Sequence, residues 1–528
     1  MKKNLELAAA GAASPQCVFR EKNAAYAIAS AVGLRQRVAR GLALDAGQEA
    51  RFLQAQRDGL VCGPGIDTLA AQTHGAMLVD GFVQPMEDTT SGHIGGLPGI
   101  MEALVQAVET MRHGAAVACD FSRLRPLGAR VAGVPAEASG PIACMQVLAR
   151  ACEAWGGGSV RRGPHTAMLR VDHPDIERFI QAAGAPDLHA PGPDRLAVGV
   201  TDAFVHAVEQ DAMFPLLHAA PAWFPAPQET GADGATHYVY RRVRARELWD
   251  RILRSAHAFG EPGVVYLDRL GQRNNLWYCE SLAAATPCSG PALPFYGGCC
   301  RAAVDLARFV HEPRGPRASF QHAGFAKVVA TGVELLDRAL DVTHWPLPQQ
   351  AAQAQGKRRI ALGFFGLAEA VARMNLRHGS PAAADFAREV ARTMRDAAYA
   401  ASVKLAARLG TFPLFEPDSY LDARAFASAL PADLQAAIRR HGIRNSHLLW
   451  LPPGDSEWVH AAQGVSSARL ASHDLAADAQ LAMLGAVAPF VDGGVGAMVG
   501  LPGSDAAVQI HDAWLQAWRL GLQACRIA

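Results

Sequence analysis

The sequence predicts an α/β fold in which strands and helices alternate along one large domain. Short apolar runs at 263–267 (GVVYL) and 358–364 (RRIALGF) have the length and composition of buried strands. The segments 145–155 and 201–213 instead carry apolar residues at helical spacing. Strands that alternate with helices are typical of α/β architectures.

The clearest helix is predicted at 380–410. Ser380 followed by Pro381 is typical of a helix start, and Gly410 is typical of a helix end. Apolar residues recur at helical spacing in between, namely Phe386, Val390, Met394 and Ala398. The helix would be about seven turns long.

The first sixty residues have a helical and rather polar pattern. We therefore predict a small helical N-terminal region at 1–60 and one main domain at 61–528. The opening MKKNLELAAAGAAS is interrupted by Glu6 before it could serve as an export signal, and the late apolar segment 481–491 is too short to cross a bilayer. We expect no membrane association.

Composition favours an enzyme that acts on small molecules. Half of the 528 residues are apolar, which is enough for a large core. A formal charge of +1, with charged residues at 19%, leaves no long-range field to attract nucleic acid. The ten cysteines form no C-x-x-C pair, which favours free thiols and a cytoplasmic location. We expect a small-molecule partner and no nucleic acid polymer.

The most informative stretch is 273–310, which contains three cysteines in a short span. Cys288 follows Pro287, and Cys299 and Cys300 stand about one loop downstream. This spacing predicts a cysteine displayed on a loop. Because most free cysteines are buried and inert, the spacing by itself leaves the role of Cys288 open.

The stretch resembles the active-site loop of the class II, adenosylcobalamin-dependent ribonucleotide reductases. Other segments are similar to the same family, in order along the chain: FSRLRP at 121–126, ASGP at 138–141, LRVDHPDIERFI from 169, KRRIALGFFGLAEA from 357 and GIRNSHLL from 442. The resemblance implies a ten-stranded α/β barrel built from two five-stranded parallel halves. A central finger loop would thread this barrel, and helices would surround it.

The resemblance also implies the chemistry. Cys288 would form a thiyl radical at the tip of the finger loop, and adenosylcobalamin would be the cofactor. An S–H bond is close in strength to a sugar C–H bond, so the radical could take hydrogen from a nucleotide or nucleoside and return it. Family members commonly pair, so a homodimer is an implied partner. His93, in SGHIGG at 91–96, is similar to a cobalamin-motif residue, but Ser91 replaces the motif's Asp. We expect a loop histidine there and no metal ligand.

Several positions depart from the family pattern. Cys299 matches the downstream cysteine of the redox pair, but Gly81 stands where the first cysteine is expected. Thr286 replaces an Asn two positions before Cys288. Gly290 replaces the Glu two positions after it, which acts as a general base in the family.

The phosphate loop of the family has also changed, to PPGDSEW at 452–458. Asp455 and Glu457 would repel a phosphate rather than bind it. Without the first redox cysteine, Cys299 could form a disulfide only with Cys300 or Cys288, and vicinal cysteines form strained disulfides. Net reduction is therefore doubtful.

These comparisons predict the site residues. The catalytic set is Cys288, Cys299 and Asp80, where Asp80 is a replacement acid or base next to Gly81; its alternative is an exposed or capping carboxylate. The substrate-binding set is Gly81, Thr286, Ser289, Gly290 and Ser139.

Three hypotheses follow from the pattern of retained and replaced residues. The first is an adenosylcobalamin-dependent radical enzyme, which the intact Cys288 favours. The second is a degenerate reductase paralogue that binds a nucleotide or regulates another protein, which the replacements favour. The third is a true reductase that uses unusual substitutes and an external reductant reaching Cys299. A likeness at the level of fold cannot decide between them.

Overall fold

The computed structural model describes residues 31–67, 77–131, 137–155, 165–184, 195–230, 234–285, 291–452, 475–500 and 506–527. Within these ranges the larger sheet has seven strands in the order β18-β19-β11-β7-β6-β5-β2. The first half of the chain supplies its parallel strands: β2 (Gly81–Gln84), β5 (Ala116–Asp120), β6 (His165–Arg170), β7 (Arg195–Val200) and β11 (Gly263–Tyr266). β18 (Gly496–Val499) and β19 (Ala524–Ile527) run parallel to each other, and β19 is antiparallel to β11.

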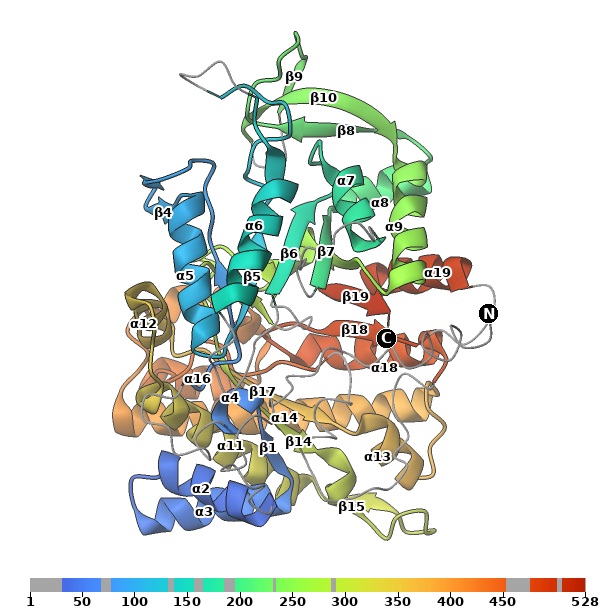
Figure 1. Cartoon of the computed structure of the whole chain (residues 1–528). Helices are drawn as coiled ribbons and strands as arrows, with labels where there is room; N and C mark the ends of the chain where they lie inside the picture. The colour runs from blue at the N-terminus through green and yellow to red at the C-terminus, as the bar shows by residue number, and fades with distance from the viewer. Residues whose placement is uncertain are drawn as a thin grey trace, which may run out of the picture.

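Helices connect the parallel strands and cover the sheet, because a parallel pair needs a crossover connection (Figure 1). They are α5 (Ile100–Arg112), α6 (Gly140–Trp155), α7 (Ile176–Gln181), α8 (Asp202–Glu209), α9 (Ala245–Phe259) and α19 (Ala506–Arg519). A separate antiparallel sheet projects at the top of Figure 1, made of β8 (Met213–His218), β10 (Thr236–Arg244) and β9 (Gln228–Thr230).

A smaller sheet lies in the lower half of the molecule in Figure 1. It contains β1 (Leu60–Cys62), β14 (Cys300–Asp305) and β17 (Ile360–Phe365), with β14 parallel to β17 and antiparallel to β1. Its helices are α4 (Pro64–Asp67), α11 (His322–Val342), α12 (Pro348–Lys357), α13 (Leu367–Arg373), α14 (Pro381–Leu409), α15 (Pro417–Tyr420), α16 (Ala432–His441) and α18 (Ala477–Val487). Further short elements are β3 (His93–Ile94), β4 (Leu97–Pro98), α10 (Leu267–Leu270), β15 (Val310–His311) and β16 (Ser319–Phe320).

Single bridges link the two sheets. Leu362 pairs with Leu449 and Leu451 with Val495, both in parallel, and Phe82 pairs with Gly298 in antiparallel fashion. The predicted α/β class is confirmed. Among the described residues, the strands form two separate sheets that only single bridges join. The strand pairing therefore does not confirm the closed ten-stranded barrel.

The long predicted helix is confirmed, and two other predicted boundaries shift. α14 begins after Ser380, whose side chain accepts a hydrogen bond from the Ala383 N–H, and it ends at Gly410. α8 stops at Glu209, before the predicted end at 213, because Asp211 has φ +49° and turns the chain. β17 begins at Ile360 because Arg358, with φ +46°, ends α12.

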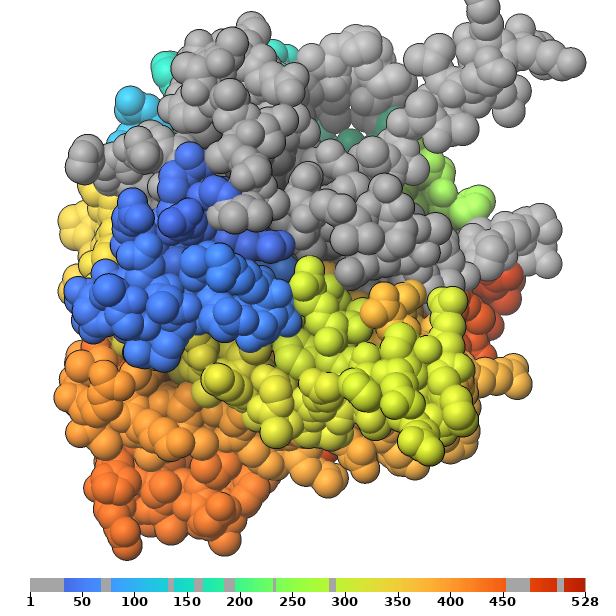
Figure 2. Space-filling view, turned by 90° about the horizontal axis from the view of Figure 1, so that it is seen from below, coloured from blue at the N-terminus to red at the C-terminus, as the bar shows by residue number. Residues whose placement is uncertain are grey.

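The N-terminal helices α2 (Ala31–Leu42) and α3 (Ala46–Asp58) lie against the second half of the chain, as the blue surface in Figure 2 shows. Gln48 on α3 donates to Glu334 on α11 across 2.9 Å. The division of the chain at residue 60 stays a prediction. Within the described ranges, no helix has both the length and the apolar character that a bilayer crossing requires.

Candidate functional site

A short hairpin carries the predicted reactive loop. β12 (Ala284–Ala285) and β13 (Ala292–Leu293) pair in antiparallel fashion, with Ala284 opposite Leu293 and Ala285 opposite Ala292. Cys288, Thr286, Ser289 and Gly290 stand between the two strands and lie outside the described residues.

Strand β13, the second strand of this hairpin, packs against one side of the large sheet. Ala292 and Leu293 belong to a buried cluster that is separate from the main core. The sheet contributes one residue from each of several strands to this cluster, namely Val83, Ala118, Met168, Val265 and Ala524. Because alternate residues of a strand face opposite sides, one side of the sheet contacts helices and the other contacts the hairpin.

Cys299 lies directly after the bridge between the two sheets. The antiparallel bridge from Phe82 to Gly298, continued by one residue, places Gly81 opposite Cys299. Residues opposite each other in such a pair have Cβ atoms about 4.5–5.5 Å apart. The nearest cross-strand position to Cys299 therefore offers no thiol.

The thiol of Cys299 is buried and protonated. Burial raises the pKa of Cys299 to about 12, although Arg301 and Arg359 oppose this shift. Burial likewise raises the pKa of Cys300 well above its ordinary value. All eight cysteines within the described ranges are free thiols.

Asp80 forms a buried ion pair beside Cys299. Its Oδ2 lies 2.9 Å from Nε of Arg301, and the two side chains are 5% and 9% exposed. Oδ1 accepts the Gly65 N–H in the first turn of α4, across 2.8 Å. Arg301 also stacks over the ring of Trp450, 5.1 Å from its centroid. Asp80 is thus buried rather than exposed, and two neighbours fix its carboxylate.

A second buried charge cluster lies at the root of the hairpin. Glu280 Oε2 lies 2.8 Å from Lys357 Nζ, and Oε1 accepts hydrogen bonds from Arg359 and from Asn274 Nδ2. Burial would raise the pKa of Glu280, but the charges of Arg359 and Lys357 hold it at about 2. Burial keeps the pKa of His447 well below its ordinary value, so the ring is neutral. Its Nε2 donates to Asn274 Oδ1 across 3.0 Å.

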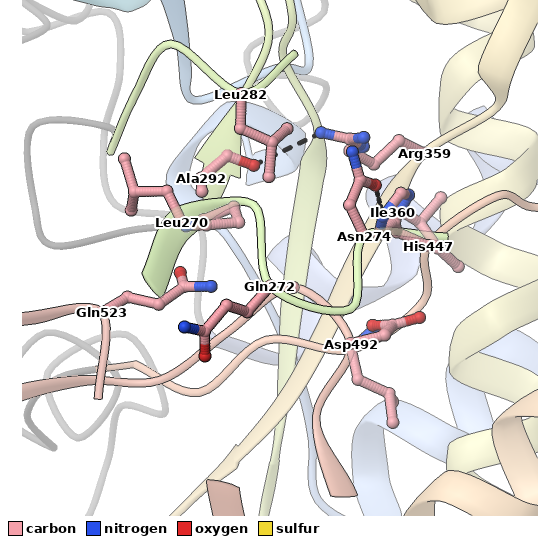
Figure 3. Close-up of a pocket in the computed structure, with 13 residues that line it drawn as sticks. Leu270, Gln272, Asn274, Leu282, Ala292, Arg359, Ile360, His447, Asp492 and Gln523 are labelled. Carbon is pink, nitrogen blue, oxygen red and sulfur yellow. Dashed lines mark hydrogen bonds between the residues drawn. The ribbon is translucent and has the colours of Figure 1, made fainter. Parts of the chain in front are cut away.

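A narrow cavity adjoins this cluster (Figure 3). Arg359, Asn274 and His447 line one side, and Gln272 and Gln523 lie across from them. The cavity has room for about one water molecule. Asp492 also lines it and accepts hydrogen bonds from Tyr399 Oη and from two backbone N–H groups, and burial raises its pKa.

The arrangement of a hairpin inside two joined sheets agrees with the sequence comparisons. Residues 81–469 match the family described as ribonucleotide reductase, barrel domain. The chain belongs to this ribonucleotide reductase family. The hairpin, Cys299 and the strands from β2 to β17 lie within the matched region, whereas β1, β18 and β19 lie outside it.

Curated members of the ribonucleotide reductase family resemble parts of the chain. A vitamin B12-dependent ribonucleoside-diphosphate reductase of Mycobacterium tuberculosis is 33% identical over 339 residues, covering 64% of this chain and 45% of the relative. A relative of the same name from Thermoplasma acidophilum is 26% identical, covering 63% and 40%. The ribonucleoside-diphosphate reductase large subunit of Caenorhabditis elegans is 24% identical, covering 66% and 47%. The chain thus spans less than half the length of these relatives.

The remaining predicted residues lie apart from the hairpin root in the fold. Ser139 is exposed and directly precedes α6. His93 is exposed on β3. Among the residues that the structure describes, no group of three or more His, Cys, Asp and Glu side chains could hold a metal ion.

Sequence reasoning missed the charged residues that the fold brings to the site: Glu280, Arg301, Lys357, Arg359 and His447. The Lys–Arg–Arg run at 357–359 directly precedes an apolar strand, and buried charges are almost always paired. That signal indicated a need for buried carboxylates but could not identify which ones.

Proposed function

We propose that this reductase-family chain is an adenosylcobalamin-dependent thiyl-radical enzyme that abstracts hydrogen from a nucleotide or nucleoside sugar without net reduction. Cys288 is the proposed radical residue. The cofactor assignment draws on the relatives named as vitamin B12-dependent. We further propose that the two bridged sheets represent the ten-stranded barrel, with the hairpin as its finger loop.

The proposal that net reduction is absent rests on the position of Gly81 opposite Cys299. Reduction of a ribose 2′-hydroxyl consumes two electrons, which a pair of thiols could supply by forming a disulfide. Cys299 has a glycine at the opposite cross-strand position, and its own thiol is protonated by burial. Cys299 therefore lacks a cross-strand thiol with which to form the disulfide that would supply both electrons, and a disulfide with the vicinal Cys300 would be strained.

The proposed reaction is therefore balanced without a reductant. The Cys288 thiyl takes a hydrogen atom from a sugar carbon, so an S–H bond forms as the C–H bond breaks. Return of hydrogen to the rearranged carbon radical reforms the thiyl. Epimerisation or dehydration of the sugar fits this balance. Asp80 is proposed as the acid or base, and its carboxylate forms an ion pair with Arg301.

Adenosylcobalamin does not fit the cavity beneath the hairpin. That cavity has room for about one water molecule, far less than the cofactor or its adenosyl group needs. When bound elsewhere in the protein, adenosylcobalamin would supply the radical. The substrate class rests likewise on the family, since the relatives are named for ribonucleoside diphosphates.

Anaerobic mixing tests the proposal. Purified protein is combined with adenosylcobalamin and a panel of ribonucleotides and nucleosides, while cob(II)alamin is followed by absorbance and radicals by electron paramagnetic resonance. Substrate-dependent cob(II)alamin, with products of unchanged oxidation level by mass spectrometry, is expected. Formation of a deoxynucleotide would contradict the redox-neutral reaction.

A glycine-to-cysteine change tests the cross-strand geometry directly. Gly81→Cys should form a disulfide with Cys299 when oxidised glutathione is added, whereas the parent should form none there. A Cβ at position 81 would lie 3.1 Å from the Ala116 Cβ, so the strand must give by a few tenths of an ångström. Peptide mass spectrometry before and after reduction identifies the bond. Gly81→Cys combined with Cys299→Ser is the matched control, and failure of Gly81→Cys to oxidise would refute the register.

A second candidate function is a degenerate, regulatory nucleotide-binding protein. The inner surface beside Cys299 favours it, because Arg301 and Trp450 stack there and Asp80 is already engaged by Arg301 and Gly65. Nucleotide binding without any cofactor cleavage across the substrate panel would support this function and exclude the radical enzyme.

We also propose a homodimer through α5 and α6. Met101 and Val105 on α5 and Val147 on α6 are each at least half exposed, which is unusual for large apolar side chains on neighbouring helices. Met101→Glu combined with Val105→Glu should convert the dimer to a monomer in light scattering. Leu409→Glu, at the exposed end of α14, should not change the mass; a monomeric parent would contradict the proposal.

A further inference from the structure

Arg359 contacts both the segment that precedes the hairpin and the second strand of the hairpin. It directly precedes β17, whose first residue, Ile360, pairs with Cys300 on β14. One guanidinium nitrogen donates to Glu280, on the segment that enters the hairpin. Another donates to the backbone carbonyl of Ala292, on strand β13, across 3.3 Å (Figure 3).

The other members of the cluster reinforce this contact. Lys357 and Asn274 share the carboxylate of Glu280, and His447 fixes the amide of Asn274. The side chains of Glu280, Lys357 and Arg359 are only 2%, 7% and 6% exposed. A buried ion without a charged partner is costly, and each of these three ions has one, so the cluster favours one arrangement of the hairpin root.

We propose that Arg359 is a positioning residue: by tying the segment before β12 and strand β13 to the start of β17, it sets the placement of the hairpin relative to Cys299. The inference rests on the proposed function for its catalytic consequence. A planar guanidinium can donate to a carboxylate and to a carbonyl at once, which a lysine ammonium cannot reproduce in the same geometry. Displacement of a reacting group by about 1 Å can lower a rate about a hundredfold.

Arg359→Lys is the decisive variant, because it keeps a positive charge beside Glu280 while removing the hydrogen bond to the Ala292 carbonyl. Arg373→Lys is the matched control: Arg373 also bridges a glutamate (Glu369, 2.8 Å) and a backbone carbonyl (Ala307, 2.9 Å), but away from the hairpin. Arg359→Gln provides a second variant that tests the charge.

Two measurements follow for each variant. The first is hydrogen exchange by mass spectrometry over 281–295, without cofactor. The Ala283 N–H, which donates to Leu293 across 2.9 Å, should exchange about tenfold faster in Arg359→Lys and be unchanged in Arg373→Lys. The second is substrate-dependent cob(II)alamin formation, whose maximal rate should fall about ten- to a hundredfold while the half-saturating substrate concentration stays within about twofold.

The outcomes separate this inference from the proposed function. Faster hairpin exchange together with a lower maximal rate supports the positioning role. If the parent forms no cob(II)alamin, the proposed function fails, and exchange alone decides whether Arg359 holds the hairpin. Unchanged exchange over 281–295 in both Arg359 variants would overturn the inference. So would a loss of rate with hairpin exchange as in the parent.

Discussion

Cys288→Ser is expected to abolish substrate-dependent cob(II)alamin formation, with a loss of about a thousandfold or more. Serine keeps the size of the side chain, but its O–H bond is much stronger than an S–H bond, so it cannot replace the thiol as the radical carrier. The change is measured anaerobically by absorbance at fixed adenosylcobalamin and substrate concentrations.

Two further cysteine variants make this result specific. Cys279→Ser is the control, since Cys279 is an exposed free thiol on the same segment before the hairpin, and it should keep the parent rate. Cys299→Ser distinguishes the reactions by their products: if no reduction occurs, the variant should give the same product as the parent. Equal rates for Cys288→Ser and the parent would remove Cys288 from the mechanism.

Arg301→Met is expected to destabilise the protein by about 3–5 kcal/mol, because it leaves the buried Asp80 carboxylate without its charged partner. The free energy of unfolding is measured by urea titration with circular dichroism. The double variant Asp80→Asn with Arg301→Met should lose less than the sum of the two single changes, as expected for directly coupled residues.

The matched control is an ion pair at the surface. Arg244 contacts Asp211 at 3.1 Å with 56% and 52% of the two side chains exposed, so Arg244→Met should cost less than about 1 kcal/mol. Asp80→Asn also tests the proposed acid or base role. Loss of cofactor turnover in the folded variant would support that role, and unchanged turnover would show that the pair is structural only.

Local signals explain which parts of the fold could be predicted. The helix at 381–409 depends on a serine cap, a proline in the first turn, short-range apolar spacing and a terminal glycine, all of which lie within one segment. The strand at 263–266 is similarly marked by its own apolar run. The ends of α8 and α12 were less predictable, because Asp211 and Arg358 adopt left-handed conformations, which are uncommon for residues other than glycine.

The sequence by itself determined the α/β class, the family resemblance and the departures at Gly81, Thr286 and Gly290. Only the tertiary structure decided which charges meet. Asp80 and Arg301 are 221 positions apart, and Glu280 and Arg359 are 79 apart. Pairing at such distances depends on strand register and on the cost of burying an ion without a partner, neither of which has a local sequence signal. The same register places Gly81 opposite Cys299.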